Sequence, residues 1–437
     1  MSDVVTQEKS DDPLAQARQF LEDGLFEECL SHLKPYWLTK PDDASATRMF
    51  GTLMTESGRS ELARKLKALA DLMEAKEPDL SEEGKQAFTY ALFEAGFSLI
   101  DVREHELALM LLNKCLAESP EDPTVNYEIA FSLMSLGRFE EAIKHFKCTA
   151  QDKEDFDTVL NLLVCYTLTR KIAEAKPLLE TLAQLAQDEE EQRELSHRKT
   201  VLTRLESLAK KTTLSTRDWL YILYGGVLLQ DDSYQDGKPK PDEKPKTAEK
   251  PKPDDHKEIA AMLLIAKGFL EGLRIEYEAI EYYNTTARPL ARVLAELMEV
   301  PCNSYMGPDR PDRALLLLTW APEIIGPHGA FVEHLQTRSI FAYGLNWDEP
   351  LPVAPEICGK LAHMAPVPWV ETTKEHSEDK IFQSILDRAR TLESDPDILR
   401  RIQEAVQYYE SKQPLLVLNN DGVFPSRPEY TAEIFPA

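Results

Sequence analysis

Features that direct an interpretation toward a catalyst or a membrane protein are missing from this sequence. Its six cysteines are scattered over 437 residues without the close pairing of a zinc site or redox motif, which predicts reduced and mostly buried thiols. The longest apolar stretches, 260–266 and 314–321, are too short to span a bilayer. No glycine-rich phosphate loop, zinc-protease helix or nucleophile elbow occurs. These absences favour a protein with no catalytic residues, no cofactor and no metal.

Positive charge is also scarce. Lys and Arg number 50 against 76 Asp and Glu, which gives a formal net charge of −26. Because phosphate binding needs clustered basic side chains, nucleic acid and anionic membranes are disfavoured, and a basic or apolar protein segment is favoured as a partner. The acidity also keeps a chain soluble whatever it binds. Residues 1–13 are polar and acidic, so we expect a disordered tail, no signal peptide and a cytoplasmic protein.

One spacing recurs in the first half of the chain. Gly24 and Gly58 lie 34 residues apart, and Phe97 and Phe131 share that offset. Small residues that let two helices approach follow at separations of 34, 45, 34 and 33: Cys29, Ala63, Ala108, Ala142 and Ala175. A period of this length predicts a repeated helix–turn–helix unit, with about eleven extra residues in the second gap.

The clearest unit resembles the tetratricopeptide repeat (TPR). Its matching residues are Tyr127, Ala130, Leu133, Gly137, Arg138, Phe139, Glu140, Glu141, Ala142, Ile143 and Phe146. The resemblance covers about residues 14–186, and the turn glycine is replaced by Arg103 in the third copy and by Lys171 in the last. It implies an α-helical TPR-like solenoid in which the first helix of each unit lines a groove for protein segments.

The resemblance assigns eight residues to that groove. Its aromatic members would form an apolar stripe, while Glu94 and Glu128, at equivalent places in adjacent units, would make the groove acidic. Because the stripe follows the helical period, ordinary packing between repeats is the alternative. The predicted partner-binding residues are Tyr90, Phe93, Glu94, Phe97, Tyr127, Glu128, Phe131 and Met134.

Residues 237–255 break the composition of the chain with recurring Lys-Pro dipeptides. Proline at this density prevents helix and central strand, and almost nothing apolar is present to bury, which predicts a disordered tether. The tether is either a plain spacer or a basic strip that docks on an acidic surface. Residues 14–212 before it form the predicted repeat domain. Two placements of the apolar segment 213–236 are open. Either it lies before the second domain and the tether is a linker, or it begins the second domain and the tether is an inserted loop.

The remaining chain, 256–437, alternates amphipathic helices with short continuous apolar runs. This pattern predicts a three-layer α/β domain with a mainly parallel sheet. The predicted strands are 277–283, 313–320 and 414–419, and the predicted helices are 256–272, 287–298, 329–343, 378–392 and 396–411.

Three groups of side chains in this domain suit a site. Asn284, Thr285 and Thr286 precede a predicted helix whose amino end can hold an anion, although Thr286 as a helix cap explains them more simply. A second group has zinc-ligand chemistry, but its spacings match no helical ligand pair, so we predict neither a metal nor a Cys358–His363 nucleophile pair. The second group comprises His328, His334, Asp348, Glu349, Cys358 and His363.

The third group is a stretch rich in proline and tryptophan between Trp347 and Trp369. It predicts either the lip of a pocket at the carboxyl edge of the sheet or a rigid cover over one of its faces.

Two functions fit these patterns. The favoured one is an adaptor or chaperone-like scaffold that binds partner segments in an aromatic, acidic TPR groove. The alternative is an enzyme or ligand-sensing protein whose α/β domain binds a small molecule while the repeats recruit a partner. Asn284, Thr286 and Glu323 are the polar side chains near predicted strand ends that favour the alternative.

Overall fold

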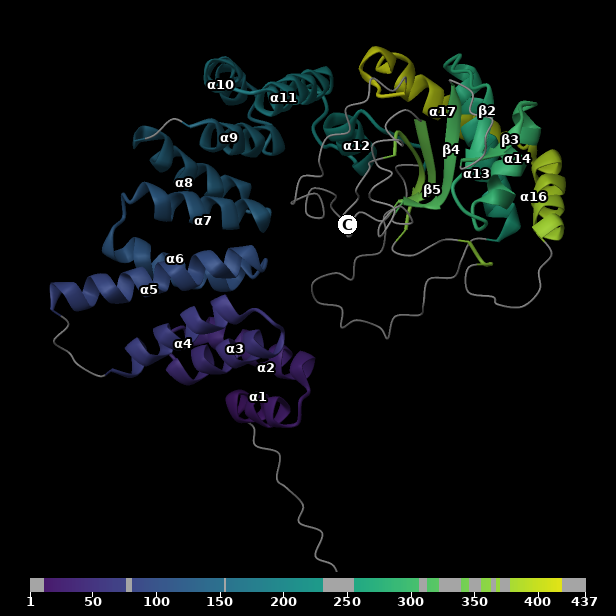
Figure 1. Ribbon diagram of the computed structural model, residues 1–437. Helices are drawn as coiled ribbons and strands as arrows, with labels where there is room; N and C mark the ends of the chain where they lie inside the picture. Colours follow the sequence, from purple (N-terminus) through teal and green to yellow (C-terminus); the bar gives the residue numbers. More distant parts are fainter. Residues whose placement is uncertain are drawn as a thin grey trace, which may run out of the picture. The chain divides into compact units, whose positions relative to one another are not determined.

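The chain divides into two compact units, Met1–Leu195 and Ser196–Ala437. In the computed structural model, the described part of the first unit is helical, and the second unit holds a sheet of parallel strands (Figure 1). Among the helices described, none combines the length and the apolarity that a bilayer crossing requires. The structure describes residues 12–75, 81–152, 155–230, 255–305, 313–321, 339–345, 355–362, 367–369 and 378–418.

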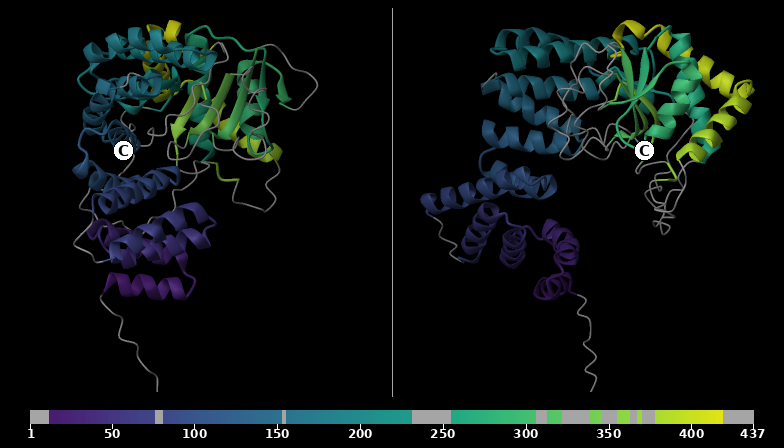
Figure 2. Two further views of the ribbon diagram at one scale, coloured as in Figure 1. Left: turned by 60° about the vertical axis from the view of Figure 1, so that its left-hand side comes forward. Right: turned by 45° about the vertical axis from the view of Figure 1, so that its right-hand side comes forward.

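Helices of the first unit pack as successive pairs, and the second helix of each pair contacts the first helix of the next (Figure 2). The predicted helix–turn–helix units therefore exist as neighbouring hairpins. The hairpins are α1 (Pro13–Glu22) with α2 (Phe26–Thr39), α3 (Ala44–Glu56) with α4 (Ser60–Glu74), α5 (Glu82–Asp101) with α6 (His105–Glu118), α7 (Pro123–Ser135) with α8 (Phe139–Asp152), and α9 (Phe156–Leu168) with α10 (Ile172–Leu185). Helix α11 (Glu189–Ser207) runs across the division between the two units.

The first helix of every hairpin begins at a side-chain cap. An oxygen of Asp12, Asp43, Ser81, Asp122 or Asp155 accepts a backbone N–H in the first turn. Such a cap satisfies one of the amides that a helix start leaves without a partner and contributes about 1 kcal/mol. Helices α2, α4, α6 and α10 have no side-chain cap of this kind. Their starts are instead set by the tight turns that precede them.

Each tight turn contains one residue with a positive φ. Gly24, Gly58 and Gly137 have φ between 71° and 78°, and Arg103 and Arg170 have φ of 62° and 60°. These positions reproduce the separations of 34, 45, 34 and 33 that the small residues show. The sequence assignment of Lys171 as the last turn residue was wrong by one position, because the left-handed residue is Arg170. Packing of the two helices holds both arginines in a conformation that costs an L-residue roughly 1–2 kcal/mol.

The unusual spacing of 45 residues reflects a longer helix. Helix α5 has 20 residues, whereas α3 and α7 have 13 each. All three end two residues before their left-handed turn residue, so the additional residues extend α5 at its amino end. Seven extra helical residues amount to about 10 Å of additional helix. The first turns of α5 therefore have no counterpart in α7.

The second unit is built on a six-stranded sheet with the order β1-β6-β5-β4-β2-β3. Every pairing is parallel. The strands are β1 (Val227–Leu228), β2 (Ala279–Tyr282), β3 (Cys302–Ser304), β4 (Ala314–Trp320), β5 (Ser339–Leu345) and β6 (Ile357–Leu361). Strands β4 and β5 lie at the centre and are almost wholly buried, as expected for continuous apolar runs in a parallel sheet.

Helices pack against this sheet and on one another. Helix α13 (His256–Gly272) contacts α14 (Arg288–Met298), and α14 contacts β2, β3 and β4. Helix α16 (Glu378–Leu392) packs on both α13 and α14, while α17 (Pro396–Glu410) packs on α13. Helix α12 (Thr216–Tyr224) leads directly into the edge strand β1. The predicted helix 256–272 and strand 313–320 agree closely with α13 and β4.

Two predicted elements are wrong in the described residues. The predicted helix 329–343 ends in residues that form β5, because the run Ser339–Leu345 is buried throughout and is paired on both sides. Residues 329–338 lie outside the described part. The predicted strand 414–419 begins instead as a 3₁₀ turn, Gln413–Leu415, in which Pro414 has no N–H to donate to a strand. Strands β1, β3 and β6 were not predicted.

Candidate functional site on the helical unit

The predicted groove residues on α5 include exposed aromatic side chains. Tyr90 is 66% exposed, the highest value for any large hydrophobic side chain in the described residues, and Phe97 is 39% exposed. Phe93 lies between them, half-buried, with its ring stacked on that of Phe97 at a centroid distance of 6.1 Å. Helix α5 therefore presents three aromatic rings along one side, two of them open to solvent.

Tyr90 and Phe93 also line a hollow of about 660 Å³. The long amino end of α5 forms one wall, since the shorter α7 does not continue alongside it. The hollow mixes apolar surface with polar groups, and both signs of charge are present. Its lining residues are Lys85, Gln86, Thr89, Tyr90, Phe93, Cys115, Glu118, Ser119, Asp122, Thr124 and Val125.

The predicted groove residues on α7 are engaged in packing. The Tyr127 ring lies edge-on to Phe146 at 5.8 Å, and its hydroxyl oxygen accepts from the Asn161 amide at 3.2 Å. Burial is the largest cause that raises the pKa of Tyr127 to about 12. Phe131 is half-buried near the His105 ring at 6.3 Å, and Met134 is only 4% exposed. The aromatic stripe is thus exposed on α5 and mostly covered on α7.

The two glutamates that the sequence places at one equivalent position differ in their surroundings. Glu94 Oε2 pairs with Lys65 Nζ of α4 at 2.8 Å, and the same ammonium donates to Ser98 Oγ at 2.9 Å. For Glu128, burial and then the negative charge of Asp101 raise the pKa to about 7. No positive charge contributes to that shift. The negative charge predicted for the groove is therefore paired with Lys65 at Glu94 and is about half lost to protonation at Glu128 near pH 7.

Neither Lys65 nor Asp101 was selected from the sequence as a site residue. A signal was nevertheless available, because Lys65 stands two residues after the anchor Ala63, and Met110 stands two residues after Ala108. Aligning the second helices as well as the first shows that the place of Lys65, which pairs with Glu94, is taken by Met110 in the hairpin before Glu128.

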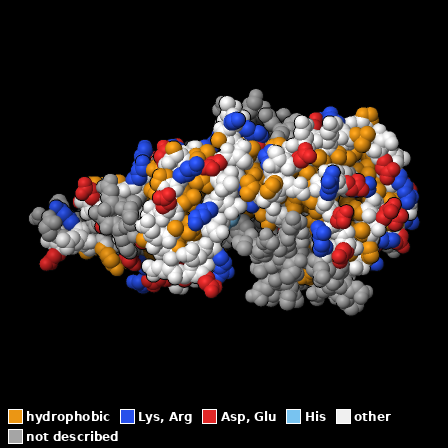
Figure 3. Space-filling model, turned by 90° about the horizontal axis from the view of Figure 1, so that it is seen from above, with side chains coloured by type: hydrophobic (Ala, Val, Ile, Leu, Met, Phe, Trp, Pro, Cys, Tyr) orange, Lys and Arg blue, Asp and Glu red, His pale blue; other side chains and the backbone are white. Residues whose placement is uncertain are grey.

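On the face of the molecule seen in Figure 3, acidic and basic side chains are interspersed. That face shows no broad patch of Lys and Arg of the kind that a phosphate backbone requires.

In the predicted anion site of the second unit, Asn284 and Thr286 make hydrogen bonds within the fold. The Asn284 side-chain oxygen accepts the N–H of Ala287 at 2.9 Å, so Asn284 caps this turn rather than Thr286. The carbonyl of Thr286 accepts from the Trp369 indole at 3.0 Å. The nearby guanidinium of Arg288 pairs with Glu378 at 3.2 Å. Thr285 is exposed.

Only part of the other two residue groups falls within the described structure. Cys358 is fully buried in β6, and burial raises the pKa of its thiol. His328, His334, Asp348, Glu349 and His363 lie outside the described residues, as do Glu323 and Trp347. Within the described residues, no three His, Cys, Asp or Glu side chains gather as metal ligands would.

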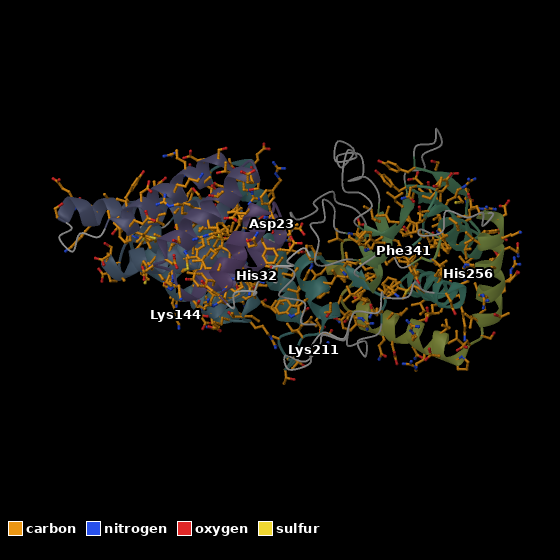
Figure 4. All side chains as sticks on the ribbon, turned by 90° about the horizontal axis from the view of Figure 1, so that it is seen from below. Asp23, His32, Lys144, Lys211, His256 and Phe341 are labelled. Atoms are coloured by element: carbon orange, nitrogen blue, oxygen red, sulfur yellow. The ribbon has the colours of Figure 1, made fainter. Side chains whose placement is uncertain are left out.

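Trp369, at the end of the proline-rich stretch, lies edge-on to His256 at 5.9 Å, and His256 Nδ1 is 2.8 Å from Ser384 Oγ. Figure 4 labels His256 among the helices of this unit and Phe341 on its sheet. The described end of the stretch therefore packs against α13 and the turn before α14.

No protein-family model matches this chain, and no curated protein matches it. Similar solved structures include "MamA AMB-1" in two crystal forms. One is 19% identical, covers 40% of this chain and 96% of that chain, and has a TM-score of 0.25. The other is 18% identical, covers 39% of this chain and 85% of that chain, and has a TM-score of 0.24. A MamA point mutant is 20% identical, covers 39% of this chain and 86% of that chain, and has a TM-score of 0.24. TM-scores this low support no functional argument.

Proposed function

We propose that this chain is a protein-interaction adaptor, a chaperone-like scaffold whose helical unit is a TPR-like solenoid. The observation that carries the proposal is the exposed aromatic side of α5. Burying large apolar side chains is favourable by roughly 25 cal/mol per Å², so rings left in water at the rim of a hollow mark a surface for another molecule. Aromatic side chains are also enriched among the residues that contribute most to protein–protein binding.

The hairpin arrangement supports this proposal. The left-handed residues follow one another at separations of 34, 45, 34 and 33, and each hairpin contacts the next, as a helical repeat requires. Repeats of this kind present an extended surface from their first helices. The longer α5 interrupts that surface with the hollow beside Tyr90, which gives a bound segment room for a large apolar side chain.

Two tyrosines provide a matched test of the proposal. Tyr90→Ala removes an exposed ring, so we expect the melting temperature to stay within about 2 °C of the wild type while affinity for a captured partner falls at least about tenfold. Tyr127→Ala removes a packed ring, and we expect a loss of roughly 3 kcal/mol in the free energy of unfolding. Full-length proteins are compared by pull-down from native extract, followed by titration with the captured partner.

Leu399→Ala is the control for the loss of an exposed apolar side chain, because Leu399 is 51% exposed on α17 of the second unit. It should leave affinity unchanged. Equal affinity of the Tyr90→Ala and wild-type proteins would contradict the assignment of the aromatic side of α5 as the binding surface.

A further inference from the structure

The glutamate position shared by α5 and α7 has different surroundings in the two hairpins. Lys65, Met110 and Lys144 each stand seven residues after the left-handed residue of their hairpin, so they occupy equivalent places on α4, α6 and α8. Glu94 and Glu128 likewise stand nine residues before the left-handed residue on α5 and α7. In each case the second helix packs on the following first helix, α4 on α5 and α6 on α7.

Between α4 and α5 these places hold a lysine together with both groups that accept its hydrogen bonds. Lys65 Nζ lies 2.8 Å from Glu94 Oε2 and 2.9 Å from Ser98 Oγ, so one ammonium satisfies a carboxylate and a hydroxyl one helical turn apart. Such a charge-assisted arrangement compensates the cost of removing both groups from water.

Between α6 and α7 the acceptors remain but the cation is missing. Glu128 takes the place of Glu94 and Ser132 that of Ser98, whereas Met110 stands in the place of Lys65. The Ser132 side chain is fully buried, and its hydroxyl makes no hydrogen bond within the described residues. Burial and the charge of Asp101 raise the pKa of Glu128 to about 7, the behaviour of a carboxylate without a counter-ion.

The interface between α8 and α9 has the opposite composition, a lysine without the carboxylate. Lys144 has the lysine place on α8, but Asn161 on α9 stands where Glu94 and Glu128 stand on the earlier helices. Asn161 instead donates to the Tyr127 hydroxyl at 3.2 Å. The unmatched carboxylate on α7 is therefore a local feature of one hairpin interface.

We propose that Glu128, with Asp101 in electrostatic reach, is an unfilled cation site, and that a Lys or Arg side chain of a bound protein segment fills it as Lys65 does for Glu94. This inference rests on the proposed adaptor function and names the chemistry of its partner. The neighbouring aromatic side of α5 would accept an apolar residue of the same segment. A segment that alternates basic and apolar side chains fits both features.

The first test is made within the chain. Met110→Lys should place an ammonium against Glu128, as Lys65 does against Glu94, and lower the pKa of the Glu128 carboxyl from about 7 to its ordinary value or below. NMR of ¹³C-labelled glutamate measures that pKa in the full-length protein. A pKa that stays near 7 in a folded variant would overturn the proposed equivalence of the two sites.

The second test measures binding of a fluorescent octapeptide of alternating lysine and leucine. We expect Glu128→Gln and Met110→Lys each to weaken its binding by about fivefold or more at low salt. Glu94→Gln removes the same charge from a carboxylate that is already paired, and Leu399→Lys adds the same charge on the second unit. Both controls should stay within about twofold of the wild type.

The outcomes separate the two proposals. A wild-type protein that does not bind the peptide counts against the adaptor function itself. Binding that survives undiminished in both Glu128→Gln and Met110→Lys overturns the cation site alone. Using Glu128→Gln beside Met110→Lys keeps the test decisive if a lysine at the half-buried position 110 prevents folding.

Discussion

Replacing Gly225 with alanine is expected to destabilise the second unit by roughly 3 kcal/mol. Gly225 ends α12 with φ of +66°, a left-handed conformation that costs any L side chain roughly 1–2 kcal/mol. A Cβ at this position would also collide with the Arg204 guanidinium and approach Val417 Cγ2 to 2.7 Å. Arg204 is 4% exposed and its Nε donates to the carbonyl of Leu415 at 2.9 Å, so it has little freedom to move away.

Gly58→Ala is the matched control for backbone strain alone. Gly58 has φ of +78°, yet a Cβ there would meet nothing within 4 Å. We expect it to cost about 1 kcal/mol in the first unit. Urea denaturation with peptide-resolved hydrogen exchange measures both units separately. Equal losses for the two variants would show that the crowding around Arg204 has no energetic weight.

Glu356→Gln is expected to change the pH dependence of stability. Burial raises the pKa of Glu356 to about 8, while its Oε2 accepts the N–H of Ile340 at 2.6 Å. Because the folded pKa lies above the unfolded one, the protonated carboxyl stabilises the fold fully below about pH 4.5, and this contribution is lost as pH rises to about 8. Glutamine keeps an acceptor for Ile340 and cannot ionise.

The stability of Glu356→Gln relative to the wild type should therefore rise between pH 5 and pH 8, by an amount on the order of 4 kcal/mol. Denaturation midpoints across that range give the difference, in which the titration of all other groups cancels. Glu410→Gln, which removes an exposed carboxylate on α17, is the control. Parallel stability profiles for Glu356→Gln and the wild type would contradict a buried, protonated Glu356.

Helices with strong apolar periodicity were predictable from the sequence. The predicted ranges 256–272 and 378–392 coincide with α13 and α16, because Asp255 caps the first and both present a continuous apolar face. The hairpin spacing was also readable, since small residues are required wherever two helices approach. Arg103 was placed correctly by the repeat spacing, whereas the last turn residue was misplaced by one position, because an arginine in a left-handed turn leaves no local sequence signal.

The short strands could not be predicted, for a physical reason. Strand β1 has two residues and β3 has three, so neither is long enough to show the alternation of apolar and polar residues that predicts a strand. Both owe their conformation to pairing with β6 and β2, which lie far away or across a helix in the sequence. Residues 339–343 of β5 were predicted as the end of a helix, because a buried apolar run has a similar composition in a helix and in a central strand.

The candidate site was predictable as a set of residues but not in its energetics. Tyr90 and Tyr127 belong to one sequence pattern, and only the structure shows that the first is 66% exposed while Phe146 and Asn161 contact the second. Glu94 and Glu128 also occupy equivalent places in the repeat, so the first helices alone do not distinguish them. Their difference follows the preceding helix, where Lys65 pairs with Glu94 and Met110 takes the equivalent place before Glu128.

The most direct test of the adaptor function is site-specific photocrosslinking from position 90. A photoreactive phenylalanine in place of Tyr90 puts the probe on the exposed aromatic side of α5, and the same probe in place of Leu399 samples an exposed apolar position on the second unit. We predict that position 90 of the full-length protein crosslinks a discrete protein species in native extract and that position 399 does not. Identical crosslinks from both positions, or none from position 90, would contradict the proposal that this surface binds a protein partner.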